Sequence, residues 1–124
     1  MDIGKLNNNT EFYDGFEDEH EIELYIADNP EINIHIWEGY FGDIFRHPSL
    51  DGNGWNGFTR DYQQLERTYE EKNVTIEISE YLTDLYIYRD NTFEYDDTRK
   101  CYNLLCEFLE YAKENGKTVK VNWW

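Results

Sequence analysis

The chain has 124 residues, of which 40% are hydrophobic and 18% aromatic. This length fits one domain over residues 1–124 with its own core, and the aromatic content argues against intrinsic disorder. Acidic residues number 27 against 11 Lys and Arg, which gives a formal net charge of −16. Such a charge repels phosphate groups, so we expect neither nucleic acid nor a membrane surface as a partner.

The location of the protein is predicted from what its sequence lacks. No apolar run is long enough to cross a membrane, and the first residues, MDIGKLNNNTEF, lack the basic start and apolar run of a signal peptide. Cys101 and Cys106 are the only cysteines, and their spacing on a predicted helix points them too far apart for a disulfide. Two unbridged thiols indicate a reducing compartment, so we expect a cytoplasmic protein.

The N-terminal part of the chain is predicted to be loop-like over residues 1–20. It combines a polar run at 7–9 and an acidic run at 17–19 with three aromatic residues, Phe12, Tyr13 and Phe16. We expect these aromatic side chains to dock the segment onto the rest of the domain.

Two strands are predicted at 21–27 and 32–38, because isoleucine and leucine alternate there with polar or aromatic residues. Pairing Ile26 with Ile32 in an antiparallel hairpin aligns the apolar residues and leaves a five-residue loop at 27–31. The opposite face of the pair then carries Glu21, Glu23, Tyr25, Asn33, His35 and Trp37.

The middle of the chain alternates strands with one short helix. A third strand is predicted at 39–45, interrupted by Gly42, and a glycine loop at 47–58. A short helix follows at 59–72, then a strand from Val74 to Ile78. A hairpin is predicted from strands 84–89 and 92–95 around Asp90-Asn91, residues that tolerate positive φ.

The last part of the chain predicts a helix at 97–114 and a strand at 119–123. The helix has one apolar stripe, and Asn115-Gly116 supplies the left-handed residue that ends it. The fold class is therefore α+β, with a mostly antiparallel sheet of about five to seven strands and helix 97–114 packed on one face. If the last strand pairs beside 92–95, the two should run parallel. The stripe consists of Cys101, Leu104, Leu105, Phe108, Leu109 and Ala112.

We find no catalytic residues in the sequence and expect no metal or cofactor. The glycine loop at 51–57 fits neither a calcium loop nor a P-loop, and we interpret it as a loop that presents Trp55. His20, His35 and His47 lack the spacing of metal ligands, and both cysteines are predicted to be structural. Pairs among 27 carboxylates are too common to indicate an active site.

The acidic residues are concentrated in the first third of the chain. Between Lys5 and Arg46 there is no Lys or Arg but there are 11 Asp and Glu residues. A concentrated field costs stability through self-repulsion, whereas Tyr and Trp among the acids are typical of protein interfaces. We therefore predict a partner-binding face made of Glu17, Asp18, Glu19, Glu21, Glu23, Tyr25, His35, Trp37 and Trp55.

In these features the chain resembles the small, acidic, cytoplasmic α+β immunity proteins of bacterial polymorphic-toxin and contact-dependent growth-inhibition systems. The resemblance rests on the acidic span 7–45 without bases, the many Tyr and Trp residues, the single small domain and the lack of catalytic motifs. It implies a protein that neutralises one cognate toxin, often a basic nuclease, by occluding its active site.

Two other readings stay open. One is a nucleic-acid mimic that inhibits a DNA-binding protein, which requires rows of carboxylates spaced like phosphates. The other is a small ligand-binding or hydrolase domain, which requires a pocket with convergent polar groups.

Overall fold

The computed structural model describes residues 3–45, 56–68 and 72–123. The described residues contain both helices and strands, and the fold is α+β, as predicted. The elements in chain order are η1 (Ile3–Leu6), β1 (Asn9–Phe12), β2 (Glu21–Ile26), β3 (Asn29–Trp37), α1 (Glu38–Phe45), α2 (Gly57–Thr68), β4 (Lys72–Thr75), α3 (Ile78–Ile87), α4 (Thr98–Glu114) and β5 (Val119–Trp123).

The five strands form one sheet in the order β1-β3-β2-β5-β4. Antiparallel pairs join β2 to β3, β2 to β5 and β4 to β5, whereas β1 runs parallel to β3. The sheet is therefore mixed, and the prediction of a mostly antiparallel sheet was wrong. The cause is β1, which lies in a segment predicted to be loop-like. It pairs with β3 and not with β2, its neighbour in the sequence.

The N-terminal segment is part of the core and not a loose extension. Residues 9–12 form β1, and Leu6 and Phe12 are almost fully buried. The prediction of a loop-like segment over 1–20 was wrong here, because a four-residue strand is too short for its alternation to be recognised. The expected docking by aromatic side chains is confirmed, since Tyr13 is buried and Phe16 stacks on Trp37.

The register predicted for the first hairpin is confirmed along most of its length. Ile22 lies opposite Ile36 and Leu24 opposite Ile34, as the alignment of apolar residues requires. The end of the hairpin differs from the prediction. A bulge between Tyr25 and Ile26 pairs Ile26 with Asn29, so the connection is shorter than the predicted five-residue loop.

The C-terminal helix and strand are confirmed as α4 and β5. Every residue of the predicted apolar stripe of α4 is buried, from Cys101 to Ala112. Gly116 has a φ of +62°, the left-handed conformation that ends the helix. Asp97 precedes the helix, but its side chain forms no capping hydrogen bond.

The predicted third strand at 39–45 is the helix α1. Phe41, Ile44 and Phe45 have helical spacing, and all three are buried. Gly42, which was predicted to interrupt the strand, permits close packing instead, as does Gly39. A Cβ at Gly39 would lie 2.3 Å from the Trp37 ring, and a Cβ at Gly42 would lie 2.6 Å from the hydroxyl oxygen of Tyr62.

The predicted hairpin at 84–95 is also wrong, because residues 78–87 form the helix α3. The alternating tyrosines suggested a strand, but Tyr81, Leu85 and Tyr88 are spaced for one helix face and are buried. The side chain of Glu77 caps the helix by accepting hydrogen bonds from the backbone N–H groups of Ser79 and Glu80, at 3.1 and 2.7 Å.

Two further boundaries differ from the prediction. The helix expected at 59–72 begins at Gly57, and Lys72 already belongs to β4. The last strand, β5, lies between β2 and β4 rather than beside residues 92–95. Most of the predicted glycine loop lies outside the described residues.

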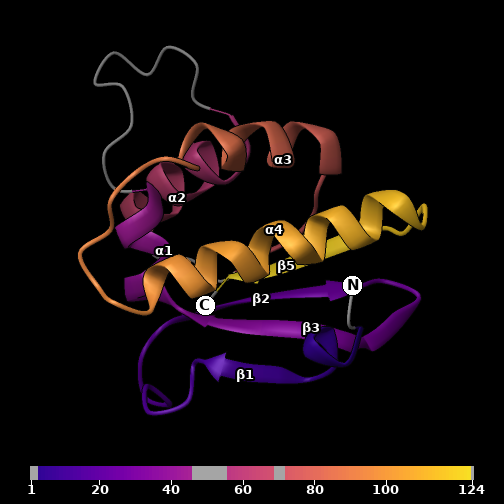
Figure 1. The fold of residues 1–124 in the computed structure, drawn as a ribbon, viewed down its shortest axis with the longest axis horizontal. Coiled ribbons are helices and arrows are strands. Elements are labelled where there is room, and N and C mark those ends of the chain that lie inside the picture. The colour runs from indigo at the N-terminus through magenta and orange to yellow at the C-terminus, as the bar shows by residue number, and fades with distance from the viewer. Residues whose placement is uncertain (1–2, 46–55, 69–71, 124) are drawn as a thin grey trace.

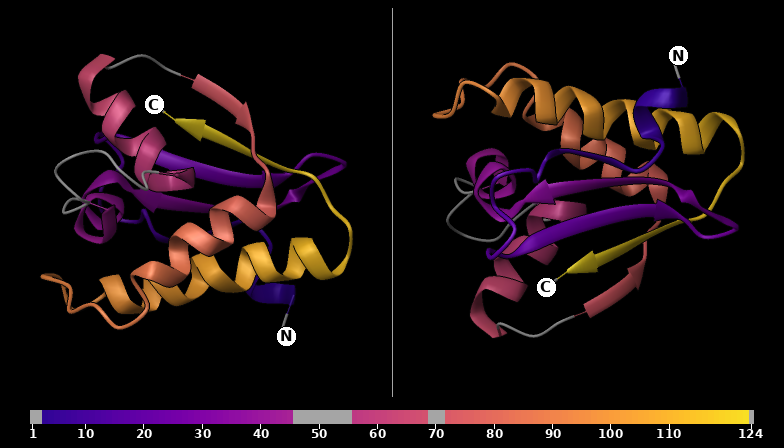
Figure 2. Two further views of the ribbon diagram at one scale, coloured as in Figure 1. Left: turned by 90° about the horizontal axis from the view of Figure 1, so that it is seen from above. Right: turned by 90° about the horizontal axis from the view of Figure 1, so that it is seen from below.

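The helices α2, α3 and α4 lie on one side of the sheet, and the strands are seen in front of them from the other side (Figures 1 and 2). The isoleucines of β2 and β3 and the valines of β5 are buried beneath these helices. The opposite face of the central strands carries polar side chains that are partly exposed. Among the described residues, no helix is long and apolar enough to span a membrane.

The packing of α4 on the sheet predicts a large cost for truncating its stripe. Leu105 is fully buried, so Leu105→Ala should lower the free energy of unfolding by about 2–5 kcal/mol. Asn103 on the same helix is exposed, and Asn103→Ala serves as the control. Equal urea midpoints for the two variants would contradict this packing.

Candidate functional site

A cluster of aromatic side chains lies where β3 ends and α1 begins. Phe16 stacks on Trp37, with ring centroids 4.0 Å apart and planes 5° apart. Tyr40 meets the Trp37 ring edge-on at 5.1 Å, and Tyr95 lies against both, at 5.5 Å from Trp37 and 6.0 Å from Tyr40. We call these four residues the aromatic cluster. Phe16 also meets Tyr40 edge-on, at 5.9 Å, so each ring packs against at least two others.

The aromatic cluster is assembled from four parts of the chain. Trp37 is the last residue of β3, and its ring covers the backbone of Gly39, where no side chain would fit. Tyr40 belongs to the first turn of α1. Phe16 comes from the turn after β1 and Tyr95 from the loop before α4, which reach the same end of the sheet (Figure 1).

An acidic turn at 17–19 follows Phe16. Its three side chains, predicted as binding residues, are exposed. The hydroxyl of Tyr13 holds the turn by donating hydrogen bonds to the backbone carbonyls of Glu17 and Glu19, at 2.9 and 2.7 Å. Burial raises the pKa of Tyr13, and the carboxylates of Glu21 and of the turn raise it further, so the hydroxyl stays a donor.

A second acidic segment, the loop 94–97, flanks Tyr95 on the other side of the cluster. Its side chains are exposed, and Asp97 lies near enough to Tyr40 to raise its pKa further, after burial, which is the larger cause. Among the described residues, no salt bridge involves the carboxylates of Asp96, Asp97 or the turn 17–19. The aromatic cluster is thus bordered by carboxylates that no described Lys or Arg neutralises.

The open face of the sheet next to Trp37 carries a chain of polar side chains. His35 lies between two carboxylates, with Nδ1 3.1 Å from Glu21 and Nε2 3.4 Å from Glu23. The other side of Glu23 accepts a hydrogen bond from Asn122 at 2.8 Å. Asn122 in turn accepts one from Asn73.

This chain of polar side chains spans four strands, and its hydrogen bonds hold those side chains in place. Asn73 also donates to the hydroxyl of Tyr25, at 3.1 Å, so the network runs from β3 across β2 and β5 to β4. Glu21 is 7% exposed, which leaves little of its carboxylate for a partner. Glu23, Tyr25 and His35 are partly exposed and present fixed polar atoms on the face.

The predicted binding residues therefore fall into three groups. Those on β2 and β3 share one face, as predicted, and the turn 17–19 joins them because Phe16 stacks on Trp37. Trp55 lies outside the described residues. The sequence analysis missed Tyr40 and the loop 94–97. A signal for the loop exists, since Glu94-Tyr95-Asp96-Asp97 repeats the composition of Phe16-Glu17-Asp18-Glu19: one aromatic residue and three acids.

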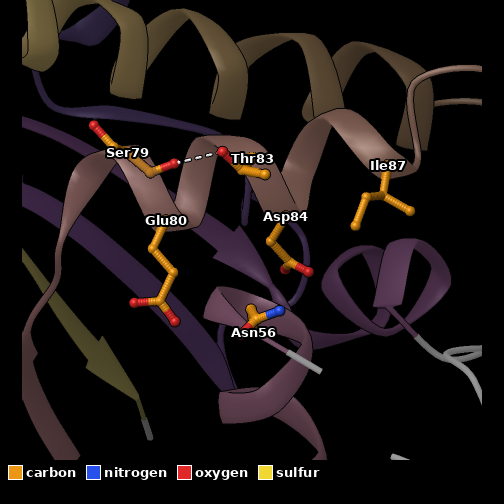
Figure 3. Close-up of a pocket in the computed structure, with 6 residues that line it drawn as sticks. All are labelled: Asn56, Ser79, Glu80, Thr83, Asp84 and Ile87. Carbon is orange, nitrogen blue, oxygen red and sulfur yellow. Dashed lines mark hydrogen bonds between the residues drawn. The ribbon is translucent and has the colours of Figure 1, made fainter. Parts of the chain in front are cut away.

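A separate cleft of about 260 Å³ lies between α3 and the start of α2. The side chains of Glu80 and Asp84 point from α3 toward Asn56, and Ile87 lies at one end (Figure 3). Asp84 is 2% exposed, and burial raises the pKa of its carboxyl from 3.8 to about 6. A buried carboxyl in a cleft is the kind of group that general acid–base chemistry uses.

The contacts of Asp84 indicate a structural role. Its Oδ2 accepts a hydrogen bond from the backbone N–H of Thr59 at 2.9 Å, and its Oδ1 accepts one from the Thr59 hydroxyl at 2.9 Å. One turn earlier, Glu80 accepts from the backbone N–H of Gly57 at 3.3 Å. Two carboxylates of α3 thus cap the free N–H groups at the start of α2.

The cysteines are free, and the described residues hold no metal-binding group. Cys101 is buried and Cys106 is half-buried, both as free thiols, and burial raises the pKa of Cys106 to about 11. Across residues 3–45, 56–68 and 72–123, no group of His, Cys, Asp and Glu side chains is arranged to hold a metal ion.

No protein-family model, no curated protein and no solved structure matches this chain. The function is therefore argued from the aromatic cluster, the two acidic segments and the polar face.

The burial of Asp84, which outweighs the opposing hydrogen bonds from Thr59, predicts a pH effect with a defined sign. Its folded-state pKa is raised, so its contribution to stability is greatest below the usual pKa near 4 and is lost as the pH rises through about 6. Asp84→Asn keeps an acceptor for the Thr59 N–H but does not ionise. From pH 4 to 7 it should gain about 2–3 kcal/mol of stability relative to the wild type.

The measurement is urea unfolding at a series of pH values, with the exposed Asp96→Asn as the control for removing one carboxylate. Parallel pH profiles for the wild type and Asp84→Asn would show that Asp84 is not desolvated as described.

Proposed function

We propose that this protein is a non-enzymatic inhibitor that binds and neutralises a basic bacterial toxin protein, as an immunity protein does. The observation that carries the proposal is the aromatic cluster bordered by two acidic segments, with the polar face of the sheet beside it. Aromatic side chains give an interface its strongest anchors, and the surrounding carboxylates select a partner with a positive surface.

The charge of this surface explains how such a partner would be found. A net charge of −16, with exposed carboxylates at 17–19 and 96–97 that form no salt bridge with a described Lys or Arg, attracts a basic protein from a distance and accelerates association. A nuclease presents a positive cleft for phosphates, and an acidic surface seated over it blocks the substrate. Inhibition of this kind needs no catalytic residue in the inhibitor.

The aromatic cluster favours a protein partner shaped to this surface over general mimicry of nucleic acid. A mimic needs rows of carboxylates spaced like phosphates, whereas here the carboxylates form two short segments on either side of contacting rings. A mimic should also compete with DNA for unrelated DNA-binding proteins, and we expect this protein to bind its one partner and not those.

A charge reversal in the acidic turn tests the proposal. Asp18→Lys with Glu19→Lys should weaken binding of the toxin by about tenfold or more, mainly through slower association, and should reduce toxin neutralisation. The side chains of Asp18 and Glu19 are exposed, so the fold should be retained. Binding is measured by titration calorimetry at low and high salt, with the toxin captured from the producing cells.

The matched control reverses two exposed carboxylates elsewhere, with Glu31→Lys and Glu114→Lys. Glu31 lies in β3 near the β2–β3 turn, at the far end of the strand from Trp37, and Glu114 is the last residue of α4. Both double variants change the net charge equally. Equal losses of affinity would mean that total charge, and not this surface, attracts the partner.

A further inference from the structure

The side chain of Asp43 on α1 accepts hydrogen bonds from the loop that carries the second acidic segment. One oxygen of its carboxylate, Oδ1, accepts a hydrogen bond from the backbone N–H of Glu94 at 3.0 Å. The other, Oδ2, accepts from the backbone N–H of Tyr95 at 3.0 Å and from the hydroxyl of Thr98 at 2.6 Å. A single side chain thus accepts hydrogen bonds from three donors that lie within five consecutive residues. We call these three hydrogen bonds the Asp43 grip.

These hydrogen bonds fix the loop at the place where it meets the aromatic cluster. Tyr95 donates one of these hydrogen bonds through its backbone N–H, and its ring lies against Trp37 and Tyr40. Thr98, the first residue of α4, is fully buried, so its bond to Asp43 also ties the loop to the start of that helix. The side chain of Asp97, just before α4, forms no capping hydrogen bond, so it does not duplicate this tie.

The charges around Asp43 make its role unusual. The loop 94–97 already carries three carboxylates, and Asp43 adds a fourth beside them. These like charges repel one another. The hydrogen bonds that Asp43 accepts from two backbone N–H groups and the Thr98 hydroxyl offset this repulsion, since bonds to a charged acceptor are stronger than those to a neutral one. The hydrogen bonds to Asp43 therefore keep the loop 94–97 in place although its carboxylates repel that of Asp43.

We propose that Asp43 is a positioning residue of the partner-binding surface, which presents Tyr95 and the carboxylates of the loop 94–97 to a basic partner in a fixed arrangement. This inference rests on the proposed function. Ordering a loop before binding removes the cost of ordering it in the complex, so the grip raises affinity without touching the partner.

The test compares two variants that remove the same charge. Asp43→Asn leaves one acceptor oxygen, so it cannot satisfy both backbone N–H groups and the Thr98 hydroxyl as the carboxylate does. Asp96→Asn removes one carboxylate from the loop and leaves the grip intact. Thr98→Val removes one of the three donors with no change of charge. Circular dichroism and urea unfolding confirm that each variant is folded.

Two readouts are measured. Hydrogen–deuterium exchange reports the protection of the Glu94 and Tyr95 amides, and fluorescence titration with octalysine reports affinity for a cationic chain. Asp43→Asn should speed exchange at these amides by about tenfold, whereas Asp96→Asn should leave it unchanged. Asp43→Asn should also weaken octalysine binding by about threefold more than Asp96→Asn does, and Thr98→Val should have a smaller effect of the same kind.

The outcomes separate the two claims. Unchanged exchange in Asp43→Asn, or equal losses of octalysine affinity in Asp43→Asn and Asp96→Asn, would overturn the positioning role alone. A wild-type protein that fails to bind octalysine at low salt would contradict the proposed function and this inference with it.

Discussion

The fold depends on the burial of one apolar face of the sheet beneath α4. The stripe from Cys101 to Ala112 packs over isoleucines of β2 and β3 and valines of β5, all of them buried. This burial leaves the other face of the same strands to polar side chains. It also sets where α4 begins, at the end of the sheet where β3 ends, and so brings the loop 94–97 to Trp37 (Figure 1).

A second theme is the use of carboxylates in a chain with few bases. Asp43, Glu77, Glu80 and Asp84 all accept hydrogen bonds from backbone N–H groups at helix starts or in a loop. Such bonds satisfy a carboxylate without a Lys or Arg, and they let the protein tolerate its charge. Glu17 likewise accepts a hydrogen bond from the backbone N–H of Gly15, at 3.0 Å. The exposed carboxylates of the turn 17–19 and of Asp96 and Asp97 lie beside the aromatic cluster, where we propose that a partner binds.

How far the sequence predicts this structure depends on the strength of each local pattern. The long stripe of α4 and the alternating isoleucines of β2 and β3 are strong patterns. The stripe was predicted correctly, and so was the strand register except at the bulge that pairs Ile26 with Asn29. The segments 39–45 and 84–95 are short and rich in aromatic residues, and helix and strand spacing overlap in them. Tertiary packing decides at 39–45, where Gly39 and Gly42 admit large rings. A local cap from Glu77 fixes the start of α3.

The residues of the proposed binding surface follow the same division. Those on β2 and β3 were predicted because strand alternation assigns faces directly. Tyr95 and the loop 94–97 were missed because their place depends on long-range contacts, the grip of Asp43 and the ring of Trp37, which no local pattern encodes. The similar composition of 16–19 and 94–97 was visible, but composition alone does not bring two segments together.

The most direct test of a binding surface at this end of the sheet is hydrogen–deuterium exchange of the protein alone and in complex with its captured partner. The account predicts slower exchange in the turn 13–19, at the end of β3 with the start of α1, and in the loop 93–97, with little change on the outer side of α4. Protection along α3 or α4, with the turn and the loop unchanged, would contradict it.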